Sequence, residues 1–285
     1  VTVATLEAGD VHEDQAAEQL AHAICPDLGH ANLRRSVAFT GRVNLIAERA
    51  GIVRLDKDRL IAMNAVDPMI TIATVPDFQQ MQSGGLVGTV KIISYAVTQS
   101  DLDRACDIAR ASVRLATPVM RSADLIVTQA VGVSPNKGVD AIRARLEALD
   151  MSLANVVTVP HMIEDLSRAI ATRTSDMTLI LTGSATSDCY DVAPMALTQA
   201  GGNLLRFGMP VDPGNLLFHG ELAGRPVIGL PGCARSPALN GADWVLSRLA
   251  CGHVLSDQDF ANMSVGGLLK EIPTRPLPRR SRKGS

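Results

Sequence analysis

The second half of the chain alternates short apolar runs with amphipathic segments. Near-continuous apolar runs occupy residues 125–128, 156–159, 177–182 and 227–230. Strands that are covered on both faces have this continuous pattern rather than an in-and-out alternation. Between the first two runs, residues 139–149 place apolar side chains on one helical face and charged side chains on the other. Strand–helix alternation predicts a three-layer αβα domain with a mainly parallel sheet, from about Ala123 to Gly252.

The first half of the chain is less regular and predicts a smaller α/β unit that precedes this domain. Its pattern favours helices over residues 13–24 and 101–110, a further helix after Gly41, and strands over residues 1–6, 70–75 and 86–93. Asp10 is the expected N-cap of the first helix. The turn-rich residues 77–85 are expected to form a loop between two strands.

Composition and charge exclude several classes of protein. Of 285 residues, 27 are Lys or Arg and 29 are Asp or Glu, so the formal net charge is 27 − 29 = −2. Such a balance gives no reason to expect nucleic acid as a partner. Hydrophobic residues make up 46% of the chain, which supports a buried core. No apolar run reaches the roughly 18 residues that span a bilayer, so no membrane is expected. Five scattered cysteines and the lack of a signal peptide favour the cytoplasm.

The end of the chain differs in composition from the rest. From Ile272 onward, prolines at close spacing are followed by a basic run. Proline at this spacing prevents helices and sheet ladders, so a linker is expected, although a basic run can also contact phosphates. The expected organisation is a smaller α/β domain over residues 1–118, the three-layer domain over residues 119–254, and an extension with the linker over residues 255–285.

Three loops follow predicted strands, where open parallel sheets bind their ligands. The first, residues 182–194, is rich in small and hydroxyl side chains and leads into a helix near Asp191. Small residues let backbone N–H groups approach an anion, hydroxyls add donors, and a helix N-terminus adds partial positive charge. Phosphate binding is one interpretation. An ordinary strand–helix turn with Asp191 as N-cap is an equally strong alternative.

The other two loops combine glycine and proline. In residues 229–237, two glycines bracket Leu230-Pro231, which predicts a fixed backbone with exposed amides. Arg235 can pair with an anion, whereas Cys233 is more simply interpreted as a packing residue than as a reactive thiol. Residues 208–215 form a strong turn signal, and a hairpin-like connection is the favoured interpretation.

In their order, the three loops resemble the molybdopterin-binding domain that the MoaB/Mog proteins share with the third domain of MoeA-type proteins. The family's strand-end loop is matched without a gap by Thr182, Gly183, Asp191, Val192 and Pro194. Its Leu-Pro-Gly loop and Pro-Gly turn are matched by Leu230, Pro231, Gly232, Pro213 and Gly214. Residues 207–249, with phrases at residues 41–45 and 89–93, resemble a bacterial subgroup in which this domain precedes a MobA-like nucleotidyltransferase domain.

The chain also departs from the family's pattern. Ser184, Ala185 and Thr186 stand where the family has Gly, Thr and Gly. The hydroxyls of Ser184 and Thr186 can still donate to phosphate, but a Cβ now occupies space in which the family's glycines let the backbone approach the ligand closely. Mog-type enzymes place acidic residues after the first two strands, where this chain has Gln129 and His161. The missing carboxylates argue against metal-assisted adenylyl transfer. The nucleotidyltransferase signature is absent from the sequence.

The resemblance implies a role in molybdenum cofactor biosynthesis, with molybdopterin or the molybdenum cofactor as ligand. Asp191 is the expected catalytic residue, acting on the dithiolene end of the pterin. The expected cofactor-binding residues are Thr182, Gly183, Ser184, Thr186, Ser187, Asp188, Pro213, Gly214, Gly229, Leu230, Pro231, Gly232 and Arg235.

Two other functions stay open at this point. One is an active enzyme that adenylates molybdopterin or inserts molybdate, which would add Mg²⁺ and ATP to the ligands. The other is a scaffold or sensor that keeps the fold without binding the pterin. Expected partners besides the pterin are a nucleotidyltransferase domain or a molybdoenzyme, and further copies of the chain in a homo-oligomer.

Overall fold

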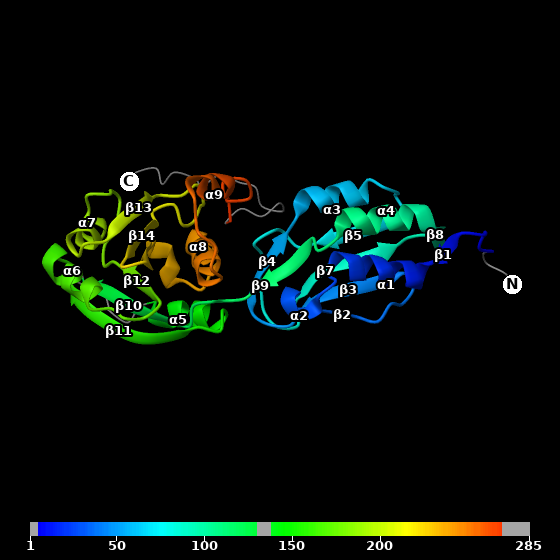
Figure 1. Cartoon of the computed structure of the whole chain (residues 1–285). Helices are drawn as coiled ribbons and strands as arrows, with labels where there is room; N and C mark the ends of the chain where they lie inside the picture. Colours follow the sequence, from blue (N-terminus) through cyan, green and yellow to red (C-terminus); the bar gives the residue numbers. More distant parts are fainter. Residues whose placement is uncertain (1–4, 130–137, 270–285) are drawn as a thin grey trace, which may run out of the picture. The chain divides into compact units, whose positions relative to one another are not determined.

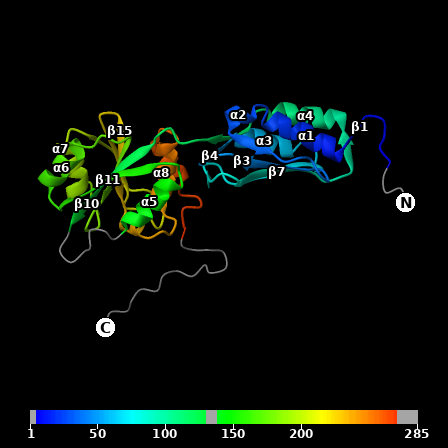
Figure 2. The ribbon, with the colours of Figure 1, turned by 90° about the horizontal axis from the view of Figure 1, so that it is seen from below.

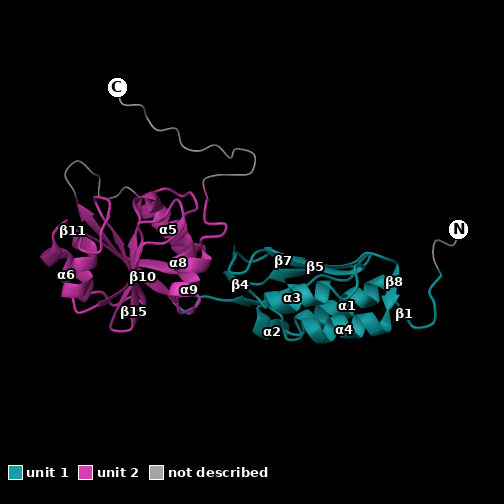
Figure 3. Ribbon diagram, turned by 90° about the horizontal axis from the view of Figure 1, so that it is seen from above, with its two compact units in different colours: residues 1–119 teal, residues 120–285 magenta. Residues whose placement is uncertain are grey.

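The computed structural model describes residues 5–129 and 138–269 of the chain. It divides into two compact units, Val1–Val119 and Met120–Ser285, which we call unit 1 and unit 2 and describe separately (Figure 3). Within the described ranges, no helix is long and apolar enough to cross a bilayer.

Unit 1 combines antiparallel sheets with helices. Its strands form sheets of order β2-β3-β7-β5 and β6-β4-β9, and a separate β1-β8 pair. Helix α1 packs on β3 and β7, and α4 packs beside α1 (Figure 2). Their apolar faces bring Leu20, Ile24 and Leu102 into the core. In chain order the elements are β1 (Asp10–His12), α1 (Glu13–Ile24), α2 (Leu28–Ala31), β2 (Leu33–Arg35), β3 (Arg42–Ala47), β4 (Gly51–Leu55), α3 (Lys57–Asn64), β5 (Ile70–Thr74), β6 (Gln80–Met81), β7 (Leu86–Ile92), β8 (Ala96–Thr98), α4 (Gln99–Ala109) and β9 (Val113–Ala116).

Some expectations for unit 1 are confirmed and others are wrong. The two predicted helices and the strands at 70–75 and 86–93 correspond to α1, α4, β5 and β7. The residues after Gly41 form strand β3 instead of a helix, because every second residue, Val43, Leu45 and Ala47, is buried. Asp10 lies in β1, and the N-cap of α1 is His12. The strand expected at residues 1–6 lies largely outside the described residues.

Unit 2 contains a six-stranded sheet of order β11-β10-β12-β15-β14-β13. The first four strands are parallel and correspond to the predicted apolar runs. The elements are β10 (Ser122–Gln129), α5 (Val139–Glu147), β11 (Ser152–Pro160), α6 (Ile163–Ala171), β12 (Met177–Leu181), α7 (Val192–Gln199), β13 (Asn203–Phe207), β14 (Phe218–Leu222), β15 (Arg225–Leu230), the short 3₁₀ helix η1 (Gly232–Arg235), α8 (Gly241–Ala250) and α9 (Asp257–Asn262).

Helices cover both faces of this sheet, as predicted (Figure 1). On one face, Leu125 and Val127 pack with the apolar residues of α5 and α8. On the other face, Ile126 and Ile180 pack with α6 and α7. Consecutive residues of one strand therefore enter different cores, which explains the continuous apolar runs.

Two antiparallel strands and a last helix extend unit 2 beyond the predicted pattern. β13 pairs with β14, and β14 pairs with β15, both antiparallel. Helix α9 buries Phe260, which is 2% exposed, in the same core as α5 and α8. Phe260 and Met263, which lie beyond residue 254, thus contribute to the core of unit 2.

Candidate functional site

The four parallel strands of unit 2 end at one edge of the sheet, which we call the carboxyl edge. Gln129 pairs with Pro160, and Leu181 pairs with both Val127 and Leu230. The loops that follow β11, β12 and β15 therefore begin next to one another. Open α/β sheets bind ligands at this edge.

The loop over residues 182–191, between β12 and α7, is shaped by its own hydroxyls. Thr182 Oγ1 donates to the carbonyl of Ser184 at 2.6 Å and lies 3.3 Å from Thr186 Oγ1. Both threonines are buried, at 7% and 8% exposure. In contrast, the backbone N–H groups of Ser184, Ala185 and Thr186 have no partner among the described residues. Successive N–H groups of this kind can bind an anion.

The Asp191 carboxylate folds back onto this loop. Its Oδ2 accepts the backbone N–H groups of Ser187 at 2.6 Å and Asp188 at 3.1 Å. Asp191 occupies the N-cap position of α7, but its side chain makes no capping hydrogen bond. The first turn of α7 is thus left without a side-chain cap, and the amides of Ser187 and Asp188 already have an anionic acceptor.

Arg235 joins the loop after β15 to the end of β12. Its Nη2 donates to the carbonyl of Thr182 at 2.8 Å. Burial lowers the pKa of the Arg235 guanidinium, which still carries its charge because an arginine pKa starts so high. Gly138, at the start of α5, lies against it with φ +97°, and a Cβ there would be 2.8 Å from Arg235 Cα. A permanent positive charge is therefore fixed beside the loop over residues 182–191.

A second arginine holds the loop after β15 in place. Arg145 of α5 is 8% exposed, and its Nε donates to Asp243 Oδ1 at 2.6 Å. Its two terminal nitrogens donate to the carbonyls of Ala141, Ala234, Ser236 and Ala238. One buried guanidinium thus fixes η1, the following loop and the start of α8, an arrangement that suits a planar fork of donors.

The glycines of this loop have different surroundings. A Cβ at Gly229 would lie 1.9 Å from the ring of Phe218, whereas a Cβ at Gly232 would have no atom within 4 Å. Leu230 is 4% exposed and belongs to the core, and Pro231 is also buried. Of the residues predicted here, Gly232 is the one with open space around it.

The turn at Pro213-Gly214 supports helix α8. The Gly241 N–H donates to the carbonyl of Pro213 at 2.8 Å. Gly214 has φ +134°, and a Cβ there would lie 2.4 Å from Gly241 N. The turn belongs to the connection between the antiparallel strands β13 and β14. Its contacts with Gly241 hold the start of α8 in place.

The sequence prediction did not assign a role to a hydrogen-bonded chain across the carboxyl edge. His161, directly after β11, contacts Thr128 through Nδ1 at 2.8 Å and Ser184 through Nε2 at 3.1 Å. Thr128 Oγ1 also accepts the N–H of Gly183 at 2.9 Å. The available signal was the position of His161 at a strand end, but no spacing pattern connects residues 128, 161 and 184.

The acidic side chains near the carboxyl edge come from several elements. Across residues 5–129 and 138–269, no three His, Cys, Asp or Glu side chains are arranged to hold a metal. Asp140 lies in the first turn of α5, and Glu164 and Asp165 lie in the first turn of α6, whereas Asp188 and Asp191 lie in the loop between β12 and α7. Asp165 pairs with Arg168.

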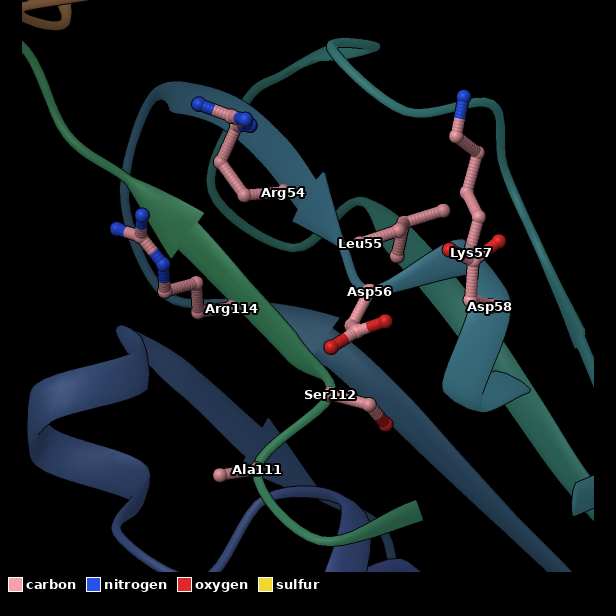
Figure 4. Close-up of a pocket in the computed structure, with 8 residues that line it drawn as sticks. All are labelled: Arg54, Leu55, Asp56, Lys57, Asp58, Ala111, Ser112 and Arg114. Atoms are coloured by element: carbon pink, nitrogen blue, oxygen red, sulfur yellow. The ribbon is translucent and has the colours of Figure 1, made fainter. Parts of the chain in front are cut away.

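Unit 1 has a cavity of its own, of about 430 Å³ (Figure 4). Arg54 of β4 and Arg114 of β9 lie directly opposite each other across the sheet, and both line it. Arg54 pairs with Asp77 at 3.5 Å and stacks on Phe78 at 4.0 Å. Lys57, Asp56 and Asp58 add charges of both signs. Positive and negative groups are nearly balanced there, so the cavity points to no single ligand class.

Comparison with known proteins gives only remote likenesses. No family model matches the chain, and no curated protein matches it. Among solved structures, the molybdopterin biosynthesis MoeA protein from Pyrococcus horikosii is 14% identical, with a TM-score of 0.37, over 85% of this chain and 79% of that one. A molybdopterin biosynthesis protein from Mycobacterium abscessus is 17% identical, with a TM-score of 0.32, over 52% and 98%. NadC from Streptococcus pyogenes is 13% identical, with a TM-score of 0.18, over 65% and 88%. All three TM-scores are below 0.5, so no function is drawn from them.

Proposed function

We propose that unit 2 binds molybdopterin or the molybdenum cofactor at the carboxyl edge and acts in molybdenum cofactor biosynthesis. The observation that carries this proposal is the group of amides at Ser184, Ala185 and Thr186, which have no partner in the described part of the chain. They lie in the loop that resembles the family's phosphate-binding loop. Arg235 adds a fixed positive charge next to them. Donors and charge of this kind suit the phosphate of the pterin.

The loops then have distinct roles. Thr182 and Thr186 hold the first loop in shape, and its free amides bind the phosphate. Gly232 allows close approach from the second loop, since nothing lies near its Cβ position. The Pro213-Gly214 turn holds the start of α8, since the Pro213 carbonyl accepts the N–H of Gly241. When bound, the pterin supplies the dithiolene that carries molybdenum, and Asp191 would face that end with Oδ1, which has no partner among the described residues.

An active adenylating or molybdate-inserting enzyme is the second candidate. Asp191 favours it, because a carboxylate with a free oxygen can act on a reacting group. Product formation from ATP and Mg²⁺ distinguishes the enzyme from a binding protein.

The test is direct titration of the full chain with anaerobically prepared molybdopterin, followed by calorimetry or fluorescence. Gly183→Val places a branched side chain in the loop over residues 182–191. The affinity for molybdopterin is expected to fall at least tenfold, which corresponds to about 1.4 kcal/mol. Circular dichroism checks that the variant is folded. A folded variant with unchanged affinity would place the ligand elsewhere, and a wild-type chain that shows no binding signal would favour the scaffold or sensor.

A further inference from the structure

Hydrogen bonds connect the side chains of Thr128, His161 and Ser184 across the carboxyl edge. Thr128 is 1% exposed, His161 is half-buried and Ser184 is exposed. The three hydrogen-bonded side chains therefore lead from the interior of the sheet to the surface of the carboxyl edge. We infer that it is a relay that orients the Ser184 hydroxyl as a hydrogen-bond donor to a bound phosphate, an inference that rests on the proposed function.

The direction follows from the hydrogens that each group carries. Thr128 Oγ1 accepts the N–H of Gly183, and its other partner among the described residues is His161 Nδ1. A buried hydroxyl left without an acceptor is unfavourable, so the Thr128 O–H donates to Nδ1. A neutral imidazole with a bare Nδ1 carries its hydrogen on Nε2, and this N–H donates to Ser184 Oγ at 3.1 Å.

The Ser184 hydroxyl hydrogen is then free to donate away from His161. Its outward direction places a donor in the same loop as the amides of Ser184, Ala185 and Thr186, for which the described residues provide no acceptor. Successive hydrogen bonds that point the same way strengthen one another. The group suited to receive them is an oxyanion, and the oxyanion of a pterin ligand is its phosphate.

The same geometry argues against Ser184 as a nucleophile. An activated serine must donate to Nε2, and Nδ1–H must then donate to an acceptor such as a carboxylate. Here the group beside Nδ1 is the Thr128 hydroxyl, and in that arrangement this hydroxyl would lose the acceptor that it has within residues 5–129 and 138–269. The serine–histidine pair therefore serves recognition of an anion and not covalent catalysis.

The test measures binding of inorganic pyrophosphate and of molybdopterin to the full chain by calorimetry. Thr128→Val removes the first hydroxyl at nearly constant volume, and Ser184→Ala removes the last. Each is expected to weaken both ligands about fivefold, the effect of one neutral hydrogen bond. The double variant should bind no more weakly than Ser184→Ala alone, because Thr128 acts through Ser184.

Two controls separate this role from a structural one. Thr178→Val makes the same substitution at a buried threonine, 5% exposed, in the neighbouring strand near its other end, and should leave binding unchanged. Thr128→Ser keeps the hydroxyl and should bind as the wild type does. Nitrogen NMR of His161, assigned with His161→Gln, should show a protonated Nε2 and a bare Nδ1 in the wild type.

The outcomes are distinguishable. Binding of molybdopterin that is equal in wild type, Thr128→Val and Ser184→Ala overturns the relay and leaves the proposed function intact. If pyrophosphate binds and its binding is weakened by Thr128→Val and Ser184→Ala, but molybdopterin does not bind, the relay is supported and the proposed pterin ligand is overturned. A neutral His161 protonated on Nδ1, or additive losses in the double variant, overturns the relay by itself.

Discussion

Removal of the Arg145 guanidinium should destabilise unit 2 far more than its single charge implies. Arg145→Met keeps an apolar stem of similar length but leaves Asp243, whose side chain is 15% exposed, without its cation. Breaking a buried ion pair from one side costs about 3–5 kcal/mol. Asp243 Oδ2 still accepts the N–H of Asn240, and the carbonyls of Ser236 and Ala238 lie at exposed residues that water can reach. We therefore expect the lower end, about 3 kcal/mol.

The assay uses the single tryptophan of the chain. Trp244 lies in α8, next to Asp243, so its fluorescence in urea reports the unfolding of unit 2. With a slope of about 2 kcal/mol per molar urea, the midpoint should fall by about 1.5 M. Arg143→Met is the matched control, since Arg143 is exposed on the same helix and such surface changes usually stay within about 0.5 kcal/mol. Arg145→Lys should not restore stability, because one ammonium cannot serve five acceptors.

A midpoint shift in Arg145→Met no larger than in Arg143→Met would refute this reasoning. It would mean that the loop after β15 is held by its apolar contacts and that the five hydrogen bonds contribute little. A large shift with an altered urea slope would instead indicate that the variant changed the cooperativity of unfolding.

Three further predictions concern the site and the sheet. Gly232→Ala adds a methyl group in open space, so thermal stability should stay unchanged while affinity for molybdopterin falls at least tenfold; equal affinity would show that the ligand does not approach this loop. Asp191→Asn keeps an acceptor for two amides but removes the charge, so stability and pterin binding should persist while cofactor maturation in a coupled assay falls at least a hundredfold; full activity would leave Asp191 a purely structural role. Burial alone would raise the pKa of Asp124, but hydrogen bonds from Asn155 and two backbone amides outweigh it and lower that pKa. The ionised Asp124 thus stabilises the folded state above the unfolded pKa of about 3.9, and this stabilisation is lost as pH falls through the lower folded pKa. The free energy of unfolding, followed by Trp244 fluorescence, should therefore fall less steeply with decreasing pH in Asp124→Asn than in wild type. The same pH dependence in both proteins would contradict this role of Asp124.

The sequence predicted β10, β12 and β15 because burial on both faces leaves a signal in consecutive residues of a strand. The apolar run of β11 has another cause, since β11 is an edge strand in which Val156 is 40% exposed. β13 and β14 carry no such signal. In β14, His219 is 5% exposed while Glu221 is only partly buried, so polar residues interrupt the apolar pattern. In unit 1, the buried residues Val43, Leu45 and Ala47 alternate with less buried ones, as in a strand. The run is so short that its pattern can be mistaken for that of a helix.

The candidate site was predictable as a set of loops but not as a set of roles. Strand order along the chain indicated that the loops after β12 and β15 would meet at one edge. Whether a hydroxyl binds a ligand or its own loop depends on contacts across the fold, as at Thr182 and Thr186. The contribution of His161 depends on partners 33 and 23 residues away in the chain, a separation at which no local pattern is informative.

The contact between Gly229 and Phe218 restricts how this protein can vary in evolution. The two residues pair directly across β14 and β15, and the aromatic ring occupies the volume where a side chain at position 229 would begin. A close-packed interior has no spare space to absorb the difference. We therefore expect these positions to change together among relatives: a chain with a side chain at position 229 should carry a small residue at position 218. Covariation of this pair would identify the β14–β15 register in relatives whose sequences are otherwise too distant to align.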